Sequence, residues 1–210
     1  MAKSKITFEV EKHQFRSKEF KSVVDQAVEF FKKTPILKLP PPQKFYGGGV
    51  YAIYYNGPFK LYKKYSGDEG KWTEVPIYVG RAVPTGSRKG INTNEDTDTR
   101  ELYTRLTQHY ASIRDANNLS VKHFTCRAMI LTDDEKDLIT PTESALIKHF
   151  QPLWNTNVDG FGNHDPGKGR RKQKKSEWDV IHPGRGWAAK QTGTPPSKDQ
   201  IRDKIENYFR

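Results

Sequence analysis

Apolar residues recur at helical spacing in several parts of the chain. Over residues 17–33, Phe, Val and Ala side chains follow one another at three- and four-residue steps behind Ser17, a residue type that caps helix N-termini. The same spacing predicts a helix over residues 99–116, and a capping-box sequence predicts a last helix over residues 198–209. The pattern therefore contains amphipathic helices at both ends and in the middle.

Three shorter segments have strand character. Residues 45–55 and 75–80 are rich in Tyr, Val and Ile, and residues 121–131 alternate apolar with polar side chains. A Ser-Gly-Asp-Glu-Gly turn signal at residues 66–70 predicts that the first two strands belong to one extended hairpin. Residues 83–98 are rich in Gly, Ser, Asn and Thr and read as a polar loop. The order of elements predicts an α/β fold.

Changes in composition divide the chain into three parts. Residues 1–43 form an N-terminal helical arm that ends in a stiff proline-rich spacer. Residues 44–157 contain the strands and form the core, with the hairpin insert at about residues 56–76. Residues 158–210, dominated by glycine, proline and basic residues, are expected to form a C-terminal basic extension.

The central helix carries polar residues on its apolar face. Leu102, Leu106 and Ile113 define that face, and Arg105 and His109 lie at steps of three, four and seven from these apolar residues. Either residue alone is compatible with a plain structural role, Arg105 at the edge of the stripe and His109 as a satisfied core histidine. When a cation and a histidine lie one turn apart on one face, a functional role for the two is as plausible as a structural one.

A second helix, which begins at Thr140-Pro141-Thr142-Glu143, repeats the conflict. Glu143 precedes the apolar Leu146, Ile147 and Phe150 at helical steps, so it lies on their face. Glu143 also stands where a capping-box glutamate would reach back to Thr140. The two interpretations differ in consequence, because a cap is replaceable at a cost of about 1 kcal/mol, whereas a metal ligand is needed for activity.

Charge points to a polyanionic partner. The chain has 36 Lys+Arg against 25 Asp+Glu, a formal net charge of +11, and cations on phosphates gain free energy by releasing counterions. Cys126 is the only cysteine, which excludes a disulfide framework and a cysteine-rich zinc site. With no signal sequence or apolar run long enough for a membrane span, we expect a cytoplasmic protein without membrane contact.

Together these features resemble the GIY-YIG nuclease superfamily. The resemblance covers about residues 45–157 and consists of five elements in order: Gly49-Val50-Tyr51, Tyr78-Val79-Gly80, Arg105, Glu143 and Asn155. The additional histidine, His109, one turn after Arg105, makes the chain resemble the type II restriction endonuclease branch of this superfamily. Two features depart from the family pattern: Val replaces Ile in both tyrosine motifs, and the segment between the tyrosines is longer than is common.

The resemblance implies a small, mainly antiparallel three-stranded sheet flanked by helices, and Mg²⁺-dependent hydrolysis of DNA. It implies that Glu143 holds one Mg²⁺ per active site, with Mn²⁺ as a substitute. Arg105 would stabilise charge on the phosphate, and Tyr51 would position or deprotonate the attacking water, with His109 as its proton acceptor. We expect the pKa of Tyr51 to be pushed below its usual value of about 10 by its cationic surroundings.

Two further residues have supporting roles in this scheme. Tyr78 is expected to orient rather than to react, and Asn155 to fix the pocket by hydrogen bonding. Without the helices that carry Arg105 and Glu143, both Tyr51 and Tyr78 would be ordinary strand aromatics.

DNA contacts are expected from basic residues outside the pocket. They are Arg81, which follows the second tyrosine motif, the run Lys168, Arg170, Arg171, Lys172, Lys174 and Lys175, and Arg185. The restriction-enzyme resemblance implies double-stranded DNA as partner, a palindromic site and a homodimer, with the helix over residues 17–33 as a candidate dimer contact or, equally, a helix that packs on its own domain. A nicking nuclease of repair or homing type and a non-catalytic nucleic-acid-binding module remain alternatives.

Overall fold

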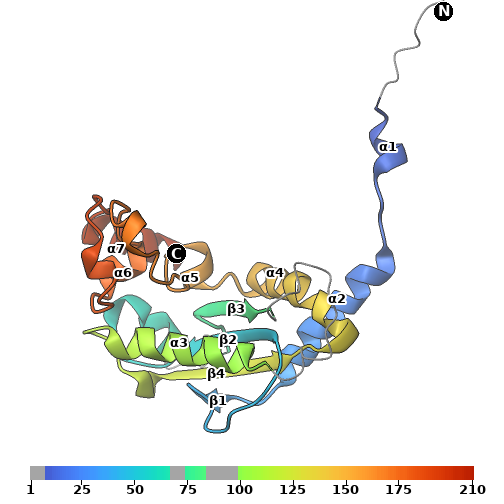
Figure 1. The fold of residues 1–210 in the computed structure, drawn as a ribbon, viewed down its shortest axis with the longest axis horizontal. Helices are drawn as coiled ribbons and strands as arrows, with labels where there is room; N and C mark the ends of the chain where they lie inside the picture. Colours follow the sequence, from blue (N-terminus) through green and yellow to red (C-terminus); the bar gives the residue numbers. More distant parts are fainter. Residues whose placement is uncertain (1–7, 67–73, 84–98) are drawn as a thin grey trace, which may run out of the picture.

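The computed structural model describes residues 8–66, 74–83 and 99–210. A four-stranded antiparallel sheet with strand order β1-β4-β2-β3 forms its centre (Figure 1). The strands are β1 (Leu37–Lys38), β2 (Gly49–Tyr55), β3 (Tyr78–Ala82) and β4 (Phe124–Ile130). The predicted α/β fold is confirmed, and β2 lies between two strands with every residue buried.

The expected three-stranded sheet was one strand short. Leu37 pairs with Cys126 and Lys38 with Thr125, so β1 extends the sheet beyond β4. A two-residue strand is too short to produce an alternating pattern, and the neighbouring prolines hid it. Part of the segment predicted as an arm therefore belongs to the sheet.

The described residues contain seven α-helices, of which all but α1 pack around the sheet. They are α1 (Val10–His13), α2 (Lys18–Lys33), α3 (Glu101–Asp115), α4 (Ile139–Phe150), α5 (Leu153–Thr156), α6 (Glu177–Ile181) and α7 (Lys198–Tyr208). Short 3-10 helices are η1 (Lys60–Ser66), η4 (Val121–His123), η5 (Asp133–Leu138), η6 (Lys168–Arg170) and η7 (Ala188–Lys190).

The alternation along β2 sends side chains into two separate cores. Tyr51, Ile53 and Tyr55 point to one face, where they join a buried cluster to which η1, β4 and the helices α3, α5, α6 and α7 contribute. Val50, Ala52 and Tyr54 point to the other face, which α2 and α4 cover. Helices on both faces are what a fully buried central strand requires.

The C-terminal segment is part of the first core. Trp178 in α6, together with Ile201 and Ile205 in α7, is fully buried in the cluster that contains Tyr51. Residues 158–210, which we expected as an extension, therefore complete the layer above the sheet. At the other end, residues 8–16 are all exposed and α1 projects away from the body (Figure 1).

Two predicted helix caps are confirmed and one is wrong. The Ser17 hydroxyl accepts from the backbone N–H of Phe20 at 3.1 Å, and Ser197 with Gln200 forms a capping box. In contrast, α4 begins at Ile139 directly after η5, with no side-chain cap. The capping role considered for Glu143 is therefore excluded, because the helix starts earlier than its Thr-Pro sequence predicts.

The segment between β2 and β3 also differs from expectation. Lys60–Ser66 forms the 3-10 helix η1 rather than an extension of the hairpin, because Tyr62 and Tyr65 are buried in the first core. The turn predicted at residues 66–70 and most of the loop predicted at 83–98 lie outside the described residues. The strand register is nevertheless defined, with Tyr51 opposite Gly80.

Candidate active site

The centre of the site is a buried tyrosine–histidine pair. Tyr51 is in the middle of β2 and His109 is on the inner face of α3; the Tyr51 hydroxyl lies 2.6 Å from Nε2 of His109. Tyr51 is fully buried and His109 is 3% exposed. Phe161 stacks on the imidazole with ring centroids 4.6 Å apart and planes within 19°. This stacking holds the imidazole in a fixed orientation beside the Tyr51 hydroxyl.

Gly80 makes room for this pair. It lies opposite Tyr51 in the sheet, and a Cβ at this position would lie 2.4 Å from the Tyr51 hydroxyl oxygen. The tyrosine ring therefore lies across the backbone of β3 where only glycine fits. This close approach explains why a glycine follows Val79 in the second motif.

Burial sets the protonation of the pair. Burial lowers the pKa of His109 well below its usual 6.5, and the nearby Arg105 and His164 lower it further. Burial also raises the pKa of Tyr51 well above 10, with the charge of Arg105 opposing the rise. The histidine is therefore neutral, and the Tyr51 O–H donates to its Nε2. The expected depression of the Tyr51 pKa is wrong for this state, because desolvation outweighs the one nearby cation.

Tyr78 and Asn155 attach to this centre from β3 and α5. The Tyr78 ring centroid lies 6.2 Å from that of Tyr51 and 5.1 Å from that of His109. The Asn155 carboxamide accepts from the Val79 N–H at 2.7 Å and donates to the Val79 carbonyl at 2.8 Å. The amide therefore takes the place of a neighbouring strand on the open edge of β3 and fixes the residue between Tyr78 and Gly80.

Arg105 and Glu143 approach the edge strand from opposite faces of the sheet. Arg105 is half-buried on α3, on the Tyr51 side, whereas Glu143 is on α4, on the Val50 side. Burial raises the pKa of both Tyr51 and Tyr78, and the charge of Glu143 adds to the rise. The contact of Glu143 with Arg81 places the glutamate beside β3.

Glu143 is paired with Arg81 in this structure. Arg81 donates from Nη1 to a carboxylate oxygen of Glu143, and the glutamate side chain is only 16% exposed. Burial raises the pKa of Glu143, with Arg81 and Arg105 opposing the rise. Arg81, expected to contact DNA, thus neutralises the carboxylate expected to bind metal.

A hard divalent ion fits Glu143. The described residues contain no group of three or more His, Cys, Asp or Glu side chains that could enclose a metal. Mg²⁺ does not need such a cage, because it commonly keeps several waters and binds through one or two carboxylates plus substrate phosphate. A partly buried carboxylate with a single cationic partner suits that mode of binding.

Sequence reasoning missed two residues of the site. Phe161 supports His109, and His164, exposed in the same loop, contacts the Arg105 guanidinium. Both residues belong to a glycine-rich segment without hydrophobic periodicity, so the sequence pattern did not predict that this segment packs beside α3. A cavity of about 210 Å³ lies between α3, this loop and residues 185–187, and His109 is among the residues that line it.

Arg185 has a structural position, contrary to the expected DNA contact. It is 3% exposed and forms a buried ion pair with Asp179 through Nε and Nη2 at 2.7 and 2.8 Å. Its remaining donors bind the backbone carbonyls of Gly160, Phe161 and Asn163. Every donor faces protein, so Arg185 anchors the loop that carries Phe161 and His164.

The basic run of residues 168–175 lies on the surface. Lys168, Arg170, Arg171, Lys172 and Lys174 are exposed and Lys175 is half-buried. The backbone of the run is tied to the chain before α7, since Thr192 N–H donates to the Arg171 carbonyl at 2.9 Å and Lys174 bridges Gly193. The cations are thus presented on an anchored loop.

This fold, with a tyrosine from each of the neighbouring strands β2 and β3 and polar groups from two helices meeting beside β3, is that of a GIY-YIG nuclease. The chain matches the family model described as the Eco29kI GIY-YIG domain over residues 43–209, and it belongs to that family of type II restriction endonucleases. A comparison with curated proteins found no match. The match extends through α7, in agreement with the packing of the C-terminal segment into the core. In the described part of the chain, no helix is long and apolar enough to cross a membrane.

Proposed function

We propose that this chain is a type II restriction endonuclease that uses one Mg²⁺ per active site to cut both strands of duplex DNA at a short palindrome. The family supports a DNA endonuclease of restriction type. The observation that carries the chemical part is the hydrogen bond between Tyr51 and a neutral His109, beside Arg105 and Glu143. It supplies a proton acceptor at a site that also contains a cation and a carboxylate.

Tyr51 and His109 would act as a proton relay in the hydrolysis. A water molecule attacks phosphorus and transfers a proton to the Tyr51 oxygen, while the Tyr51 hydroxyl proton moves to Nε2 of His109. This relay avoids a free phenolate, whose formation the raised pKa of Tyr51 opposes. The bond to the 3′ oxygen breaks, and that oxygen takes a proton from solvent, which leaves a 3′ hydroxyl and a 5′ phosphate.

Positioning comes from the surrounding groups. Arg105 donates to the non-bridging phosphate oxygens as negative charge accumulates, and Tyr78 and Asn155 hold β3 in place. Glu143 would hold the Mg²⁺, which supplies charge stabilisation for the phosphate and the leaving oxygen. Arg81 would exchange its contact with Glu143 for a DNA phosphate, since a bound cation takes over the neutralisation of the carboxylate.

Duplex binding would use the basic run and a second copy of the chain. The exposed cations of residues 168–175 suit phosphates or guanine edges in the major groove. A twofold dimer matches a palindrome because each copy reads one half-site. On α2, Phe20, Val23 and Phe30 remain exposed, at 54%, 41% and 64%, although Val24, Val28 and Phe31 pack on the domain. The helix thus has an outer apolar face available for the partner.

Supercoiled plasmid DNA tests the proposal. With Mg²⁺ we expect discrete linear fragments whose sequenced ends share one short palindrome, and with EDTA we expect intact DNA. Nicked circles alone would contradict double-strand cleavage and indicate a nicking enzyme, and retarded but uncut DNA would indicate a binding module. In the same assay, Glu143→Gln should lose cleavage. Its control is Lys148→Gln, which removes an exposed charge from the same helix and should cut normally.

A further inference from the structure

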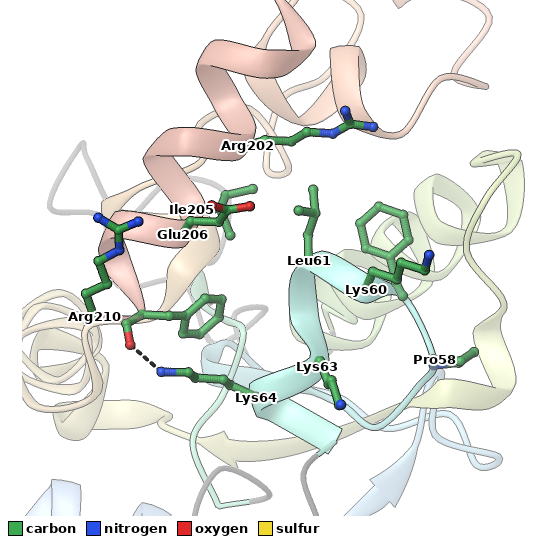
Figure 2. A pocket seen from close by; sticks show the side chains of 11 residues that line it. Pro58, Lys60, Leu61, Lys63, Lys64, Arg202, Ile205, Glu206 and Arg210 are labelled. Carbon is green, nitrogen blue, oxygen red and sulfur yellow. Dashed lines mark hydrogen bonds between the residues drawn. The ribbon is translucent and has the colours of Figure 1, made fainter.

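A second concave surface lies between η1 and α7, apart from the candidate active site. It is a groove of about 1020 Å³ lined by Pro58, Phe59, Lys60, Leu61, Lys63, Lys64, Arg202, Ile205, Glu206, Phe209 and Arg210. Figure 2 shows the side chains of the two elements facing each other, with Leu61 and Ile205 in the middle and the cations around them. We call it the η1–α7 groove.

The groove begins at the far end of β2 from the tyrosine–histidine pair. The Tyr55 hydroxyl accepts from the Phe59 N–H at 2.9 Å, which fixes the start of η1. Tyr55 follows Tyr51 by four residues, and a strand rises about 3.3 Å per residue, so the two positions lie roughly 13 Å apart along β2. None of the proposed catalytic residues lines the groove.

The rim of the groove is strongly cationic. Five of its residues are Lys or Arg, and Glu206 is its only acidic residue. Arg202 forms an exposed ion pair with Asp199 at 3.2 Å, and Lys64 donates to the Phe209 carbonyl. Lys60, Lys63 and Arg210 have no carboxylate partner within the described parts of the chain. The rim therefore has unneutralised positive charge to offer a ligand.

The floor of the groove is apolar and partly aromatic. Leu61, Phe59 and Phe209 are only partly buried, and Ile205 closes the floor beneath them. Phe209 is held by an edge contact to Tyr65 with centroids 5.8 Å apart, and Phe59 by a tilted contact to Tyr62 at 4.9 Å. Two aromatic rings are thus fixed in position below the cations.

We propose that the η1–α7 groove binds single-stranded DNA. A cationic groove with aromatic side chains on which bases stack is the combination that single-strand-binding proteins use. Duplex DNA fits less well, because its bases are paired and stacked and cannot cover the apolar floor. An acidic peptide would satisfy the rim, but DNA is the polyanion on which this family acts. The inference concerns binding alone and does not depend on the proposed cleavage.

The test is fluorescence anisotropy of a labelled oligo-dT of about 12 nucleotides, within the site sizes common for such grooves. The full-length chain is used in EDTA, so no cleavage interferes. We expect Lys60→Glu/Lys63→Glu to weaken binding at least tenfold. It should also reduce the slope of log affinity against log salt by about 1.4, the value for two lost phosphate contacts on a single strand.

A matched control separates the groove from general charge. Lys172→Glu/Lys174→Glu makes the same charge change on the basic run, and it should weaken duplex binding while leaving oligo-dT affinity unchanged. Wild-type chain that does not bind oligo-dT, or equal losses in the two double variants, would overturn the proposal. So would equal, groove-dependent binding of blunt duplex, or tighter groove-dependent binding of poly-L-glutamate.

The aromatic floor has its own test. Phe209→Leu keeps the apolar volume but removes the ring, and we expect a roughly 5- to 150-fold loss of oligo-dT affinity, the range for one base–aromatic stack. Thermal unfolding of the same variant verifies that the fold is retained. Unchanged affinity in a folded Phe209→Leu would overturn the stacking role.

Discussion

Tyr51 holds its proton against a histidine that is too buried to be charged. The hydroxyl-to-Nε2 distance of 2.6 Å defines the donor and the acceptor once the two pKa shifts are considered. The resemblance implied that His109 would accept a proton from Tyr51, and its place on the apolar stripe directed it towards the core. The prediction that the pKa of Tyr51 would be lowered was wrong, because burial of the side chain raises the pKa.

This protonation predicts a flat pH profile. A relay from neutral Tyr51 to neutral His109 requires pH above the lowered pKa of His109 and below the raised pKa of Tyr51. We expect the single-turnover cleavage rate to be nearly constant between about pH 6.5 and 8.5. A tenfold rise per pH unit would instead identify a phenolate as the base, and a loss centred near 6.5 would identify an ordinary, solvated histidine.

Glu143 is expected to be needed for activity but not for stability. Burial raises its pKa, so the folded state disfavours its charged form at neutral pH. Glu143→Gln removes that cost, and we expect an unchanged or slightly higher melting temperature together with loss of cleavage. Calorimetry and the plasmid assay measure the two effects. An active Glu143→Gln whose stability is about 1 kcal/mol lower would contradict a metal-binding role.

At the scale of elements, strongly periodic segments were predictable and short ones were not. The helices with apolar stripes and the three longer strands occur where the pattern places them, and Ser17 caps α2 as expected. The two-residue β1 and the 3-10 helix η1 were missed, because both depend on tertiary contacts of a few side chains. Local pattern cannot encode such contacts.

The loop of residues 160–164 shows how an irregular element is held in place. Arg185 donates to Asp179 and to three carbonyls of this loop, and its guanidinium lies 4.6 Å from the ring centroids of both Trp178 and Trp187. The basic, glycine-rich sequence around Arg185 predicts a surface cation, whereas the side chain is 3% exposed. Its partner Asp179 lies in α6, a helix of five residues that is too short to be predicted from hydrophobic periodicity.

Replacing Arg185 should therefore destabilise the fold. Removing one member of a buried ion pair leaves the other charge uncompensated, and we expect Arg185→Met to lower the free energy of unfolding by about 3–5 kcal/mol. Urea unfolding measures it, with exposed Arg171→Met as the control, for which we expect a change within about 0.5 kcal/mol. A fully stable Arg185→Met with weakened DNA binding would restore the DNA-contact interpretation.

At the scale of the whole molecule, the sheet divides the chain into two layers with different tasks. One layer, α3 with α5 to α7, supplies His109, Arg105 and the η1–α7 groove, and the other, α2 with α4, supplies Glu143. The proposed site forms where the layers meet at β3, and the projecting α1 lies at the opposite end from α7 (Figure 1). This arrangement depends on strand order, which the sequence did not define.

The outer face of α2 predicts the oligomeric state. Phe30 is 64% exposed on a helix whose other side is packed. We expect light scattering to give twice the chain mass for the wild type, and Phe30→Ser to shift the equilibrium at least tenfold towards monomer, since apolar burial in the interface is lost. Phe15→Ser, on the exposed N-terminal segment, is the control. A monomeric wild type at micromolar concentration would contradict the dimer.

The most direct test of the central claim is single-turnover cleavage of duplex DNA by Tyr51→Phe. The variant removes one oxygen from a packed ring, so it should fold and bind DNA like the wild type. Without the hydroxyl, the path from water to His109 is broken, and we expect the cleavage rate with Mg²⁺ to fall by about 10²- to 10⁴-fold. A folded Tyr51→Phe that cleaves within a few-fold of the wild-type rate would contradict a site built on the Tyr51–His109 pair.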